Sequence, residues 1–153
     1  MWNNFFNHVD VKKENVNILN GNAEDLEAEC QRYEDKIKSY GGIHLFMGGI
    51  GPDGHIAFNE PDEKLVAGTH LTSLTESTIN ANARFFEKKE DVPTQAVTMG
   101  MASIMQAKKV LLIADGPAKK EAIEKSFFGP ICPEVPASVL QLHPDLTVIC
   151  NVD

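Results

Sequence analysis

The stretch "KKVLLIADGPAKKEAIEKSFFG", residues 108–129, indicates the class of the fold. Its first eight residues include a short apolar run that is typical of a buried strand. Pro117 then stands where the first turn of a helix tolerates proline, and Gly129 is suited to end that helix. A strand, a tight turn and a helix in direct succession predict an α/β fold.

Two elements upstream fit the same pattern. Residues 22–42 predict a helix, because their apolar side chains recur at three- and four-residue spacing, with Asn22 as the candidate N-cap. The run "IHLFM", residues 43–47, lies between glycines, which favours a strand buried on both faces of a parallel sheet. His44 in that run is interpreted as a hydrogen-bonded core histidine rather than a catalyst.

The remaining elements complete an alternation of strands and helices. They are a helix over residues 76–86 capped by Thr75, a strand over 96–100, a short helix in "MASIMQA", a helical turn in "VPASVLQLHP" and a final strand over 146–150. Buried strands that alternate with amphipathic helices predict a largely parallel sheet flanked by helices. Because no repeat, linker or low-complexity tract divides the chain, we expect residues 1–153 to form one domain.

Composition narrows the class of ligand. The chain has 153 residues, of which 42% are hydrophobic, and a formal net charge of −8. An acidic surface argues against binding to nucleic acid or to anionic membranes, so any anionic ligand needs a local basic cluster. No apolar stretch is long enough for a membrane span and no signal peptide begins the chain, so a soluble, cytoplasmic protein is expected. Cys30, Cys132 and Cys150 lack metal-binding spacing and are interpreted as buried reduced thiols.

The stretch "GGIGPDGHIAFNEP", residues 48–61, is the candidate site. It follows a predicted strand directly, and ligands of open α/β sheets bind beyond the carboxyl ends of the strands. We interpret Gly48, Gly49 and Gly51 as residues that permit positive φ angles and a close approach of the backbone to a ligand. Gly54 is interpreted as the residue that allows a tight turn.

Three titratable residues lie in this stretch. Asp53 and His55 are two residues apart, and Glu60 follows five residues later. A carboxylate beside one ring nitrogen would fix the tautomer of His55 and make the other nitrogen more basic, which suits proton transfer near neutral pH. Two alternatives remain open. One is a polar turn in which Asp53 caps backbone amides while His55 and Glu60 face solvent. The other is a zinc site, although no second histidine lies nearby.

The same stretch resembles the signature of the glucosamine-6-phosphate deaminase family, also called glucosamine-6-phosphate isomerase. The related 6-phosphogluconolactonases share a "GxGxDGHxAS" core but continue toward "LFP", where this chain has "FNEP". The resemblance extends through "NFFNHVD", "NILNGNA", "RYEDKI", "ANARFF", "VPTQAVTMG" and "LQLHP". It implies a Rossmann-like α/β fold for nearly all of the chain.

The resemblance also implies an activity. It is the conversion of glucosamine 6-phosphate and water to fructose 6-phosphate and ammonia, with no metal or other cofactor. In this interpretation His55 moves a proton at the ring oxygen of the sugar, and Asp53 and Glu60 set its charge and orientation. Arg84 and Lys119 match the family's contacts to the sugar phosphate, and both side chains suit a phosphate group.

The chain departs from the family pattern in two ways. It contains neither a "PTGxTP" phosphate loop nor the "DEY" aspartate that moves a proton between C2 and C1. We therefore expect the chain to correspond to roughly the C-terminal two-thirds of a family member and to lack the C-terminal helix as well. By itself it should be nearly inactive, and it should self-associate or need the missing N-terminal part as a partner. His70 and Thr72 stand where hexameric members activated by N-acetylglucosamine 6-phosphate carry basic residues, so such activation is not expected.

Two other functions stay open. One is a lactonase that hydrolyses 6-phosphogluconolactone without release of ammonia. The other is a non-catalytic module that binds a sugar phosphate.

Overall fold

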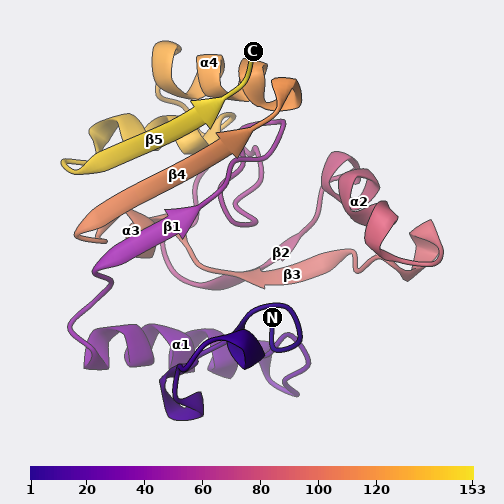
Figure 1. Cartoon of the computed structure of the whole chain (residues 1–153), viewed down its shortest axis with the longest axis vertical. Helices are drawn as coiled ribbons and strands as arrows, with labels where there is room; N and C mark the ends of the chain where they lie inside the picture. The colour runs from indigo at the N-terminus through magenta and orange to yellow at the C-terminus, as the bar shows by residue number, and fades with distance from the viewer.

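The computed structural model describes residues 1–153, and the chain forms two sheets in it. The larger is a parallel sheet with the order β1-β4-β5, and the smaller is an antiparallel pair, β2-β3 (Figure 1). The strands are β1 (Leu45–Gly48), β2 (His70–Ser73), β3 (Gln95–Thr98), β4 (Lys109–Asp115) and β5 (Leu146–Asn151). The predicted α/β class with a parallel sheet flanked by helices is confirmed.

The helices are short apart from the first. They are α1 (Leu26–Ser39), α2 (Glu76–Asn82), α3 (Met101–Met105) and α4 (Lys120–Phe128), together with the 3₁₀ helices η1 (Phe6–His8), η2 (Lys13–Asn15), η3 (Ala83–Phe85), η4 (Lys89–Asp91), η5 (Pro117–Lys119) and η6 (Pro136–Leu142). None of the helices has the length and apolar character that crossing a membrane requires.

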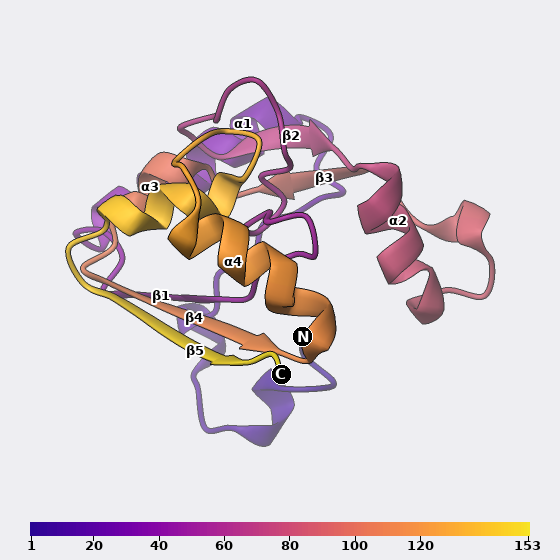
Figure 2. The same cartoon turned by 90° about the horizontal axis from the view of Figure 1, so that it is seen from above.

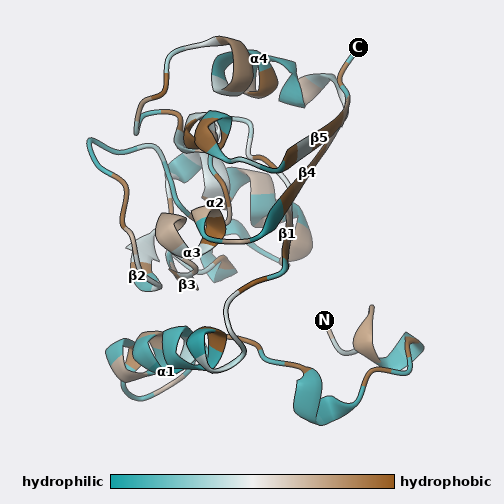
Figure 3. Ribbon diagram, turned by 90° about the vertical axis from the view of Figure 1, so that its left-hand side faces the viewer, coloured by the Kyte–Doolittle hydropathy of each residue, from teal (hydrophilic) through white to brown (hydrophobic).

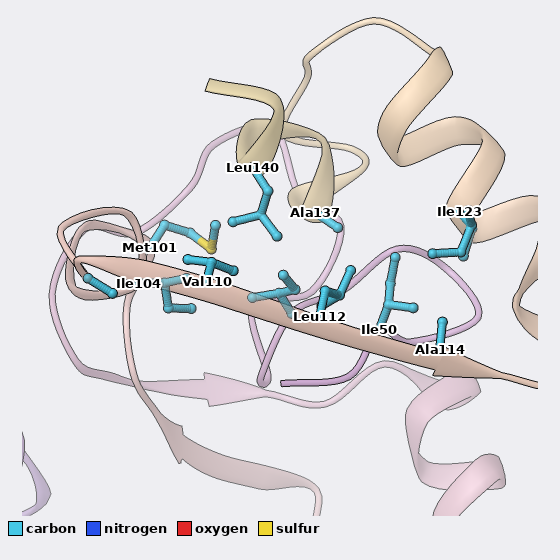
Figure 4. Close-up of a cluster of buried hydrophobic side chains, with 12 residues drawn as sticks. Ile50, Met101, Ile104, Val110, Leu112, Ala114, Ile123, Ala137 and Leu140 are labelled. Atoms are coloured by element: carbon cyan, nitrogen blue, oxygen red, sulfur yellow. The ribbon is translucent and has the colours of Figure 1, made fainter. Parts of the chain in front are cut away.

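The hydrophobic core lies on one face of the parallel sheet. Val110, Leu112 and Ala114 of β4 point toward η6 and α4, where Leu140 and Ile123 meet them (Figure 4). Alternate residues of a strand point to opposite faces, so these three side chains share one face. This core holds the carboxyl ends of β1 and β4 in a fixed position.

The opposite face of the sheet is open, because α3, α4 and η6 all lie on the core side (Figure 2). Leu45 and Met47 of β1 are 53% and 65% exposed, and Ile113 and Ile149 are also exposed. The prediction that residues 43–47 form a strand buried on both faces is therefore wrong. A run without polar residues does not reveal that only one of its faces is covered.

Two smaller predictions need correction. The N-cap of α1 is Asp25, which accepts a hydrogen bond from the Ala28 amide at 2.9 Å, and Asn22 lies before the helix. His44 is exposed rather than in the core, and its Nε2 lies 3.3 Å from Nζ of Lys108.

The three cysteines are free, as expected, but they are not all buried. Cys30 is buried, Cys132 is half-buried and Cys150 is exposed. Cys150 ends up exposed because it lies near the end of β5, an edge strand of the sheet.

The segment from α2 to η4, residues 76–91, projects from the body of the molecule and is called the arm (Figure 1). Thr75 caps its first helix as predicted, with Oγ1 accepting from the Thr78 amide at 3.3 Å. The helix predicted over 76–86 is α at its start and 3₁₀ at its end. The N-terminal segment and α1 lie apart from the parallel sheet (Figure 3).

Candidate active site

Residues 48–61, the signature loop, leave the carboxyl end of β1 and turn back tightly. The Gly51 amide donates to the His55 carbonyl at 2.9 Å, and the Gly54 amide donates to the Gly51 carbonyl at 3.1 Å. Gly54 has a φ of +86°, and a Cβ there would lie 2.8 Å from Cγ1 of Val135. The prediction that Gly54 allows a tight turn is confirmed, because other residues rarely adopt this φ.

For the other glycines of the loop, the predicted positive φ angles are wrong, whereas the close approach of their backbone to a ligand stays a prediction. Gly48, Gly49 and Gly51 do not adopt positive φ. A Cβ on Gly51 would overlap the imidazole of His55. Glycine at position 51 therefore makes room for the His55 ring and does not supply an unusual backbone conformation.

The imidazole of His55 lies between two carboxylates. Its Nδ1 is 2.7 Å from Oδ1 of Asp53 and 3.4 Å from Oε2 of Glu60. The His55 side chain is 16% exposed and the Glu60 side chain only 7%. One part of the polar-turn alternative is present, since Asp53 Oδ1 accepts from the His55 amide at 3.2 Å. The other part is wrong, because His55 and Glu60 do not face solvent.

Glu60 is also tied to the start of the arm. Thr75 Oγ1 lies 3.3 Å from Oε2 of Glu60 in a hydrogen bond, and the same hydroxyl oxygen caps α2. One threonine thus joins the carboxylate beside His55 to the helix that leads into the arm. In the sequence, the only visible signal of Thr75 is that of an N-cap, so its place in the site could not be predicted.

Two further residues hold the loop against β3. Asn59 is buried, and its amide nitrogen donates to the carbonyls of Ile56 and Met99 at 2.9 Å each. The Phe58 amide donates to Oγ1 of Thr98 at 3.0 Å. These contacts fix the backbone just before Glu60. The role of Thr98 has no signal in the sequence, since Thr98 lies 40 residues away from its partner.

The two predicted basic residues reach the same pocket as His55. This pocket has a volume of about 390 Å³ and is lined by Gly49, Ile50, Gly51, Pro52, His55, Ala57, Phe58, Thr78, Ala81, Asn82, Arg84 and Lys119. Arg84 comes from η3 of the arm, and Lys119 comes from η5 after β4. Three segments far apart in sequence therefore form one pocket.

The surroundings of Lys119 disfavour the positive charge of its ammonium group. Burial lowers the pKa of its ammonium group, the Asp53 carboxylate partly opposes that shift, and the Arg84 charge adds to it. Its Nζ donates to the Ile50 carbonyl at 2.6 Å. An anion in the pocket would stabilise both cations, because it would relieve their mutual repulsion.

The remaining predicted site residues are not part of the lining of this pocket. Asp53 and Gly54 do not line it, although Asp53 contacts His55. Glu60 lines a second pocket of about 370 Å³, together with His70, Thr72 and Thr75. Glu60 therefore lies between the two pockets.

Residues 1–149 match the family described as glucosamine-6-phosphate isomerases/6-phosphogluconolactonase. The chain belongs to this family. The chain is 60% identical over 150 residues to the glucosamine-6-phosphate deaminase of Lachnoclostridium phytofermentans. This match covers 98% of the chain and 64% of that protein. The chain is 57% identical over 151 residues to the deaminase of Thermoanaerobacter pseudethanolicus, covering 99% of this chain and 60% of the relative. The resemblance stated from the signature loop is thereby confirmed.

Solved structures agree with these relatives. A monomeric glucosamine-6-phosphate deaminase of the NagB superfamily superposes with a TM-score of 0.94 at 45% identity, over 98% of this chain and 62% of that one. A devB protein superposes with a TM-score of 0.72 at 19% identity, over 95% of this chain and 59% of that one, and shows the fold alone. The chain thus spans about 60% of the length of the proteins that it matches.

Proposed function

We propose that the signature loop and the pocket beside it belong to an isomerase and deaminase. The reaction is the conversion of glucosamine 6-phosphate and water to fructose 6-phosphate and ammonia. The observation that carries the proposal is that His55, Arg84 and Lys119 line one pocket while two carboxylates contact the imidazole. Relatives that are 52–60% identical carry the name glucosamine-6-phosphate deaminase.

The substrate phosphate is assigned to Arg84 and Lys119. An arginine offers two parallel N–H donors to a phosphate, and a lysine adds a compact positive charge. Burial already lowers the pKa of Lys119, and a phosphate group would favour its charged form. These two cations are the local basic cluster that an acidic chain needs in order to hold an anion.

His55 is assigned to ring opening. Its Nδ1 is inaccessible and lies beside the carboxylates of Asp53 and Glu60, so Nε2 is the nitrogen left to serve the pocket. A carboxylate beside one ring nitrogen makes the other more basic. The imidazole can then move a proton at the ring oxygen of the sugar.

The step between C2 and C1 needs a base that these residues do not supply. No aspartate or glutamate lines the 390 Å³ pocket. Asp62 faces the second pocket, and Glu63 is exposed. A positioned base typically contributes about 10²- to 10⁴-fold to the rate. We therefore propose that the 153 residues bind substrate but scarcely turn it over until the remaining part of the protein completes the site.

The open face of the parallel sheet suggests how that part is joined. Leu45, Met47, Ile113 and Ile149 form an exposed apolar surface on β1, β4 and β5. Such a surface is costly in water. We propose that the chain alone self-associates through this face, and that the missing part covers it in a longer form. Sedimentation of the chain should show species larger than a monomer, and a monomer at all concentrations would contradict this. The single domain and the cytoplasmic location stay predictions.

Two measurements test the proposed function. The first is release of ammonia and fructose 6-phosphate from glucosamine 6-phosphate, by the 153-residue chain and by the same chain completed with the remaining segment of the Lachnoclostridium phytofermentans deaminase. Turnover is expected only in the completed protein, and His55→Ala should abolish it while His70→Ala should not. Turnover by the 153 residues alone would show that the base lies within them.

The second measurement is substrate binding by calorimetry. Arg84→Ala should weaken the binding of glucosamine 6-phosphate, whereas Lys88→Ala, an exposed cation of the same arm, should not. Equal affinity in both variants would contradict the phosphate assignment. If the completed protein binds substrate without turnover, the non-catalytic module is favoured. Hydrolysis of 6-phosphogluconolactone without release of ammonia would favour the lactonase.

A further inference from the structure

We propose that Asn20 is a site of self-modification, at which the side-chain amide is lost as ammonia. Asn20 is the only asparagine of the chain that a glycine follows. Both Asn20 and Gly21 are exposed, in the turn that leads to α1. The reaction open to this pair is attack of the Gly21 backbone nitrogen on Cγ of Asn20. It involves neither the signature loop nor the arm, so the inference is independent of the proposed function.

The Gly21 amide is free to attack. Its N–H donates no hydrogen bond within the chain, so none has to break before the nitrogen loses its proton. Apart from the chain neighbours of Gly21, nothing lies within 4 Å of the place where a Cβ would stand. Glycine also has the widest choice of backbone angles, which lets residue 21 turn its nitrogen toward the preceding side chain.

The side chain of Asn20 is held in a way that favours this attack. Its Oδ1 accepts a hydrogen bond from the Asn22 amide at 3.1 Å. Negative charge develops on this oxygen when the Gly21 nitrogen adds to Cγ. A backbone N–H that points at such an oxygen stabilises the transition state, as in an oxyanion hole. The turn therefore supplies both the nucleophile and a donor that stabilises the developing charge.

The atoms balance with water as the only co-reactant. The bond between the Gly21 nitrogen and Cγ of Asn20 forms, and the proton of the Gly21 N–H passes to solvent. The bond between Cγ and Nδ2 breaks, and the leaving group takes up a proton and departs as ammonia. The product is a cyclic imide, which water opens at either carbonyl to give an aspartate or an isoaspartate at position 20. No atom is oxidised or reduced.

The conversion weakens the attachment of residues 1–19 to α1. The Asn20 amide donates to Oε1 of Glu29 at 2.8 Å, and the Asn20 carbonyl accepts from the Ala23 amide at 3.2 Å. Hydrogen bonds from Arg32 and from the Asn20 amide lower the pKa of Glu29 to about 2, so this carboxylate is charged. A carboxylate at position 20 therefore adds a second negative charge to the residue whose amide Glu29 binds.

An isoaspartate also disturbs the turn, because it adds a methylene group to the backbone. Few other contacts hold the segment before the turn. None of residues 1–19 is buried, and this segment lies apart from the parallel sheet (Figure 3). The modification therefore loosens the N-terminal segment and leaves the hydrophobic core intact.

The experiment is incubation of the folded 153-residue chain in neutral and in mildly alkaline buffer, followed by peptide mapping with mass spectrometry. Asn20 is expected to convert before any other asparagine, and both aspartate and isoaspartate should form. Isoelectric focusing should show one additional negative charge. Conversion should be faster in the alkaline buffer, because the deprotonated amide is the nucleophile.

Gly21→Ala is the matched variant, because a Cβ at position 21 meets no other atom and Gly21 does not adopt a positive φ. It should fold like the unchanged chain. The added methyl group hinders the approach to Cγ, so conversion should slow by about tenfold, which corresponds to a barrier higher by about 1.4 kcal/mol. Asn15→Gln changes another exposed asparagine and should leave the rate at Asn20 unchanged. The inference is overturned if Gly21→Ala converts as fast as the unchanged chain, or if another asparagine converts first.

Limited digestion with trypsin tests the attachment of residues 1–19. Cleavage after the exposed Lys12 and Lys13 should be several-fold faster in the converted chain than in the fresh chain. Gly21→Ala kept for the same time should be cleaved at the rate of the fresh chain. Equal cleavage of converted and fresh chains would overturn the loosening. Neither measurement uses enzymatic activity, so failure of the proposed function would not affect them.

Discussion

The signature loop and the arm line the same pocket, but they are held in different ways. Ile50, Ile56 and Asn59 of the loop are at most 5% exposed and pack into the body of the protein. In the arm only Thr78 is buried, and Phe85 is 68% exposed. Segments with few buried apolar contacts open at low free energy. The proposed proton-transfer residues are therefore on a fixed frame, while the proposed phosphate residue Arg84 is on a segment that can shift.

The largest expected loss of stability comes from a change at Ile56, which anchors the signature loop in the hydrophobic core. Ile56 is fully buried in the hydrophobic core, so Ile56→Ala removes apolar contacts and leaves a cavity. The free energy of unfolding should fall by about 2–5 kcal/mol. Urea unfolding followed by circular dichroism measures it. A loss below about 1 kcal/mol would show that the loop is no better anchored than the arm.

The next largest loss of stability is expected when a side chain at position 51 fills the space that the His55 ring occupies. A Cβ on Gly51 overlaps the imidazole, so Gly51→Ala must displace the ring or the loop. Overpacking of this kind typically costs about 1–3 kcal/mol. Urea unfolding gives the cost, and the NMR signals of the His55 ring should shift. Gly68→Ala is the matched control, since nothing lies within 4 Å of a Cβ there. Equal behaviour of the two variants would remove the reason for glycine at position 51.

The chemistry of the loop could be predicted because it is local. Asp53, His55 and Glu60 lie within eight residues, and a tight turn at Gly54 brings Asp53 and His55 together. The strand, turn and helix after residue 108 were predictable for the same reason. Arg84 and Lys119 were assigned from the resemblance alone, because no local pattern distinguishes them from exposed helix charges.

Features that depend on distant partners could not be predicted from the sequence. The face of β1 that carries Leu45 and Met47 is exposed because no helix covers it, and an apolar run does not report this. Asn22 and Asp25 are both good N-caps, and only the backbone geometry selects Asp25. The contact of Thr75 with Glu60 spans 15 residues and has no signature in either segment.

A smaller loss of stability is expected from a change at Glu34. Glu34 of α1 accepts hydrogen bonds from the amide and hydroxyl of Thr69, just before β2, and from Ser103. Burial would raise the pKa of Glu34, but these hydrogen bonds together lower it below its ordinary value of 4.5. A carboxyl group with a lowered folded-state pKa stabilises the fold above pH 4.5, and this contribution is lost as pH falls through the folded-state pKa.

Glu34→Gln should therefore lower the free energy of unfolding by about 1 kcal/mol at neutral pH. It should also reduce the loss of stability of the chain below pH 4.5. Urea unfolding at a series of pH values measures both. Asp35→Asn, on an exposed neighbour, is the control and should change stability by less than about 0.5 kcal/mol. An unchanged pH dependence in Glu34→Gln would show that Thr69 and Ser103 do not favour the charged form.

The smallest effect on stability is expected within the arm itself. Phe85 is a large apolar side chain, yet its 68% exposure means that Phe85→Ala should change the free energy of unfolding by less than about 0.5 kcal/mol. Its ring lies 4.8 Å from the guanidinium carbon of Arg84, and such a contact is worth about 0.5–1 kcal/mol at exposed sites. Loss of that support should weaken binding of inorganic phosphate about two- to fivefold. Calorimetry with phosphate measures this, with Phe86→Ala as the control. A stability loss as large as that of Ile56→Ala would mean that the arm is as firmly held as the loop, and the contrast between the two sides of the pocket would disappear.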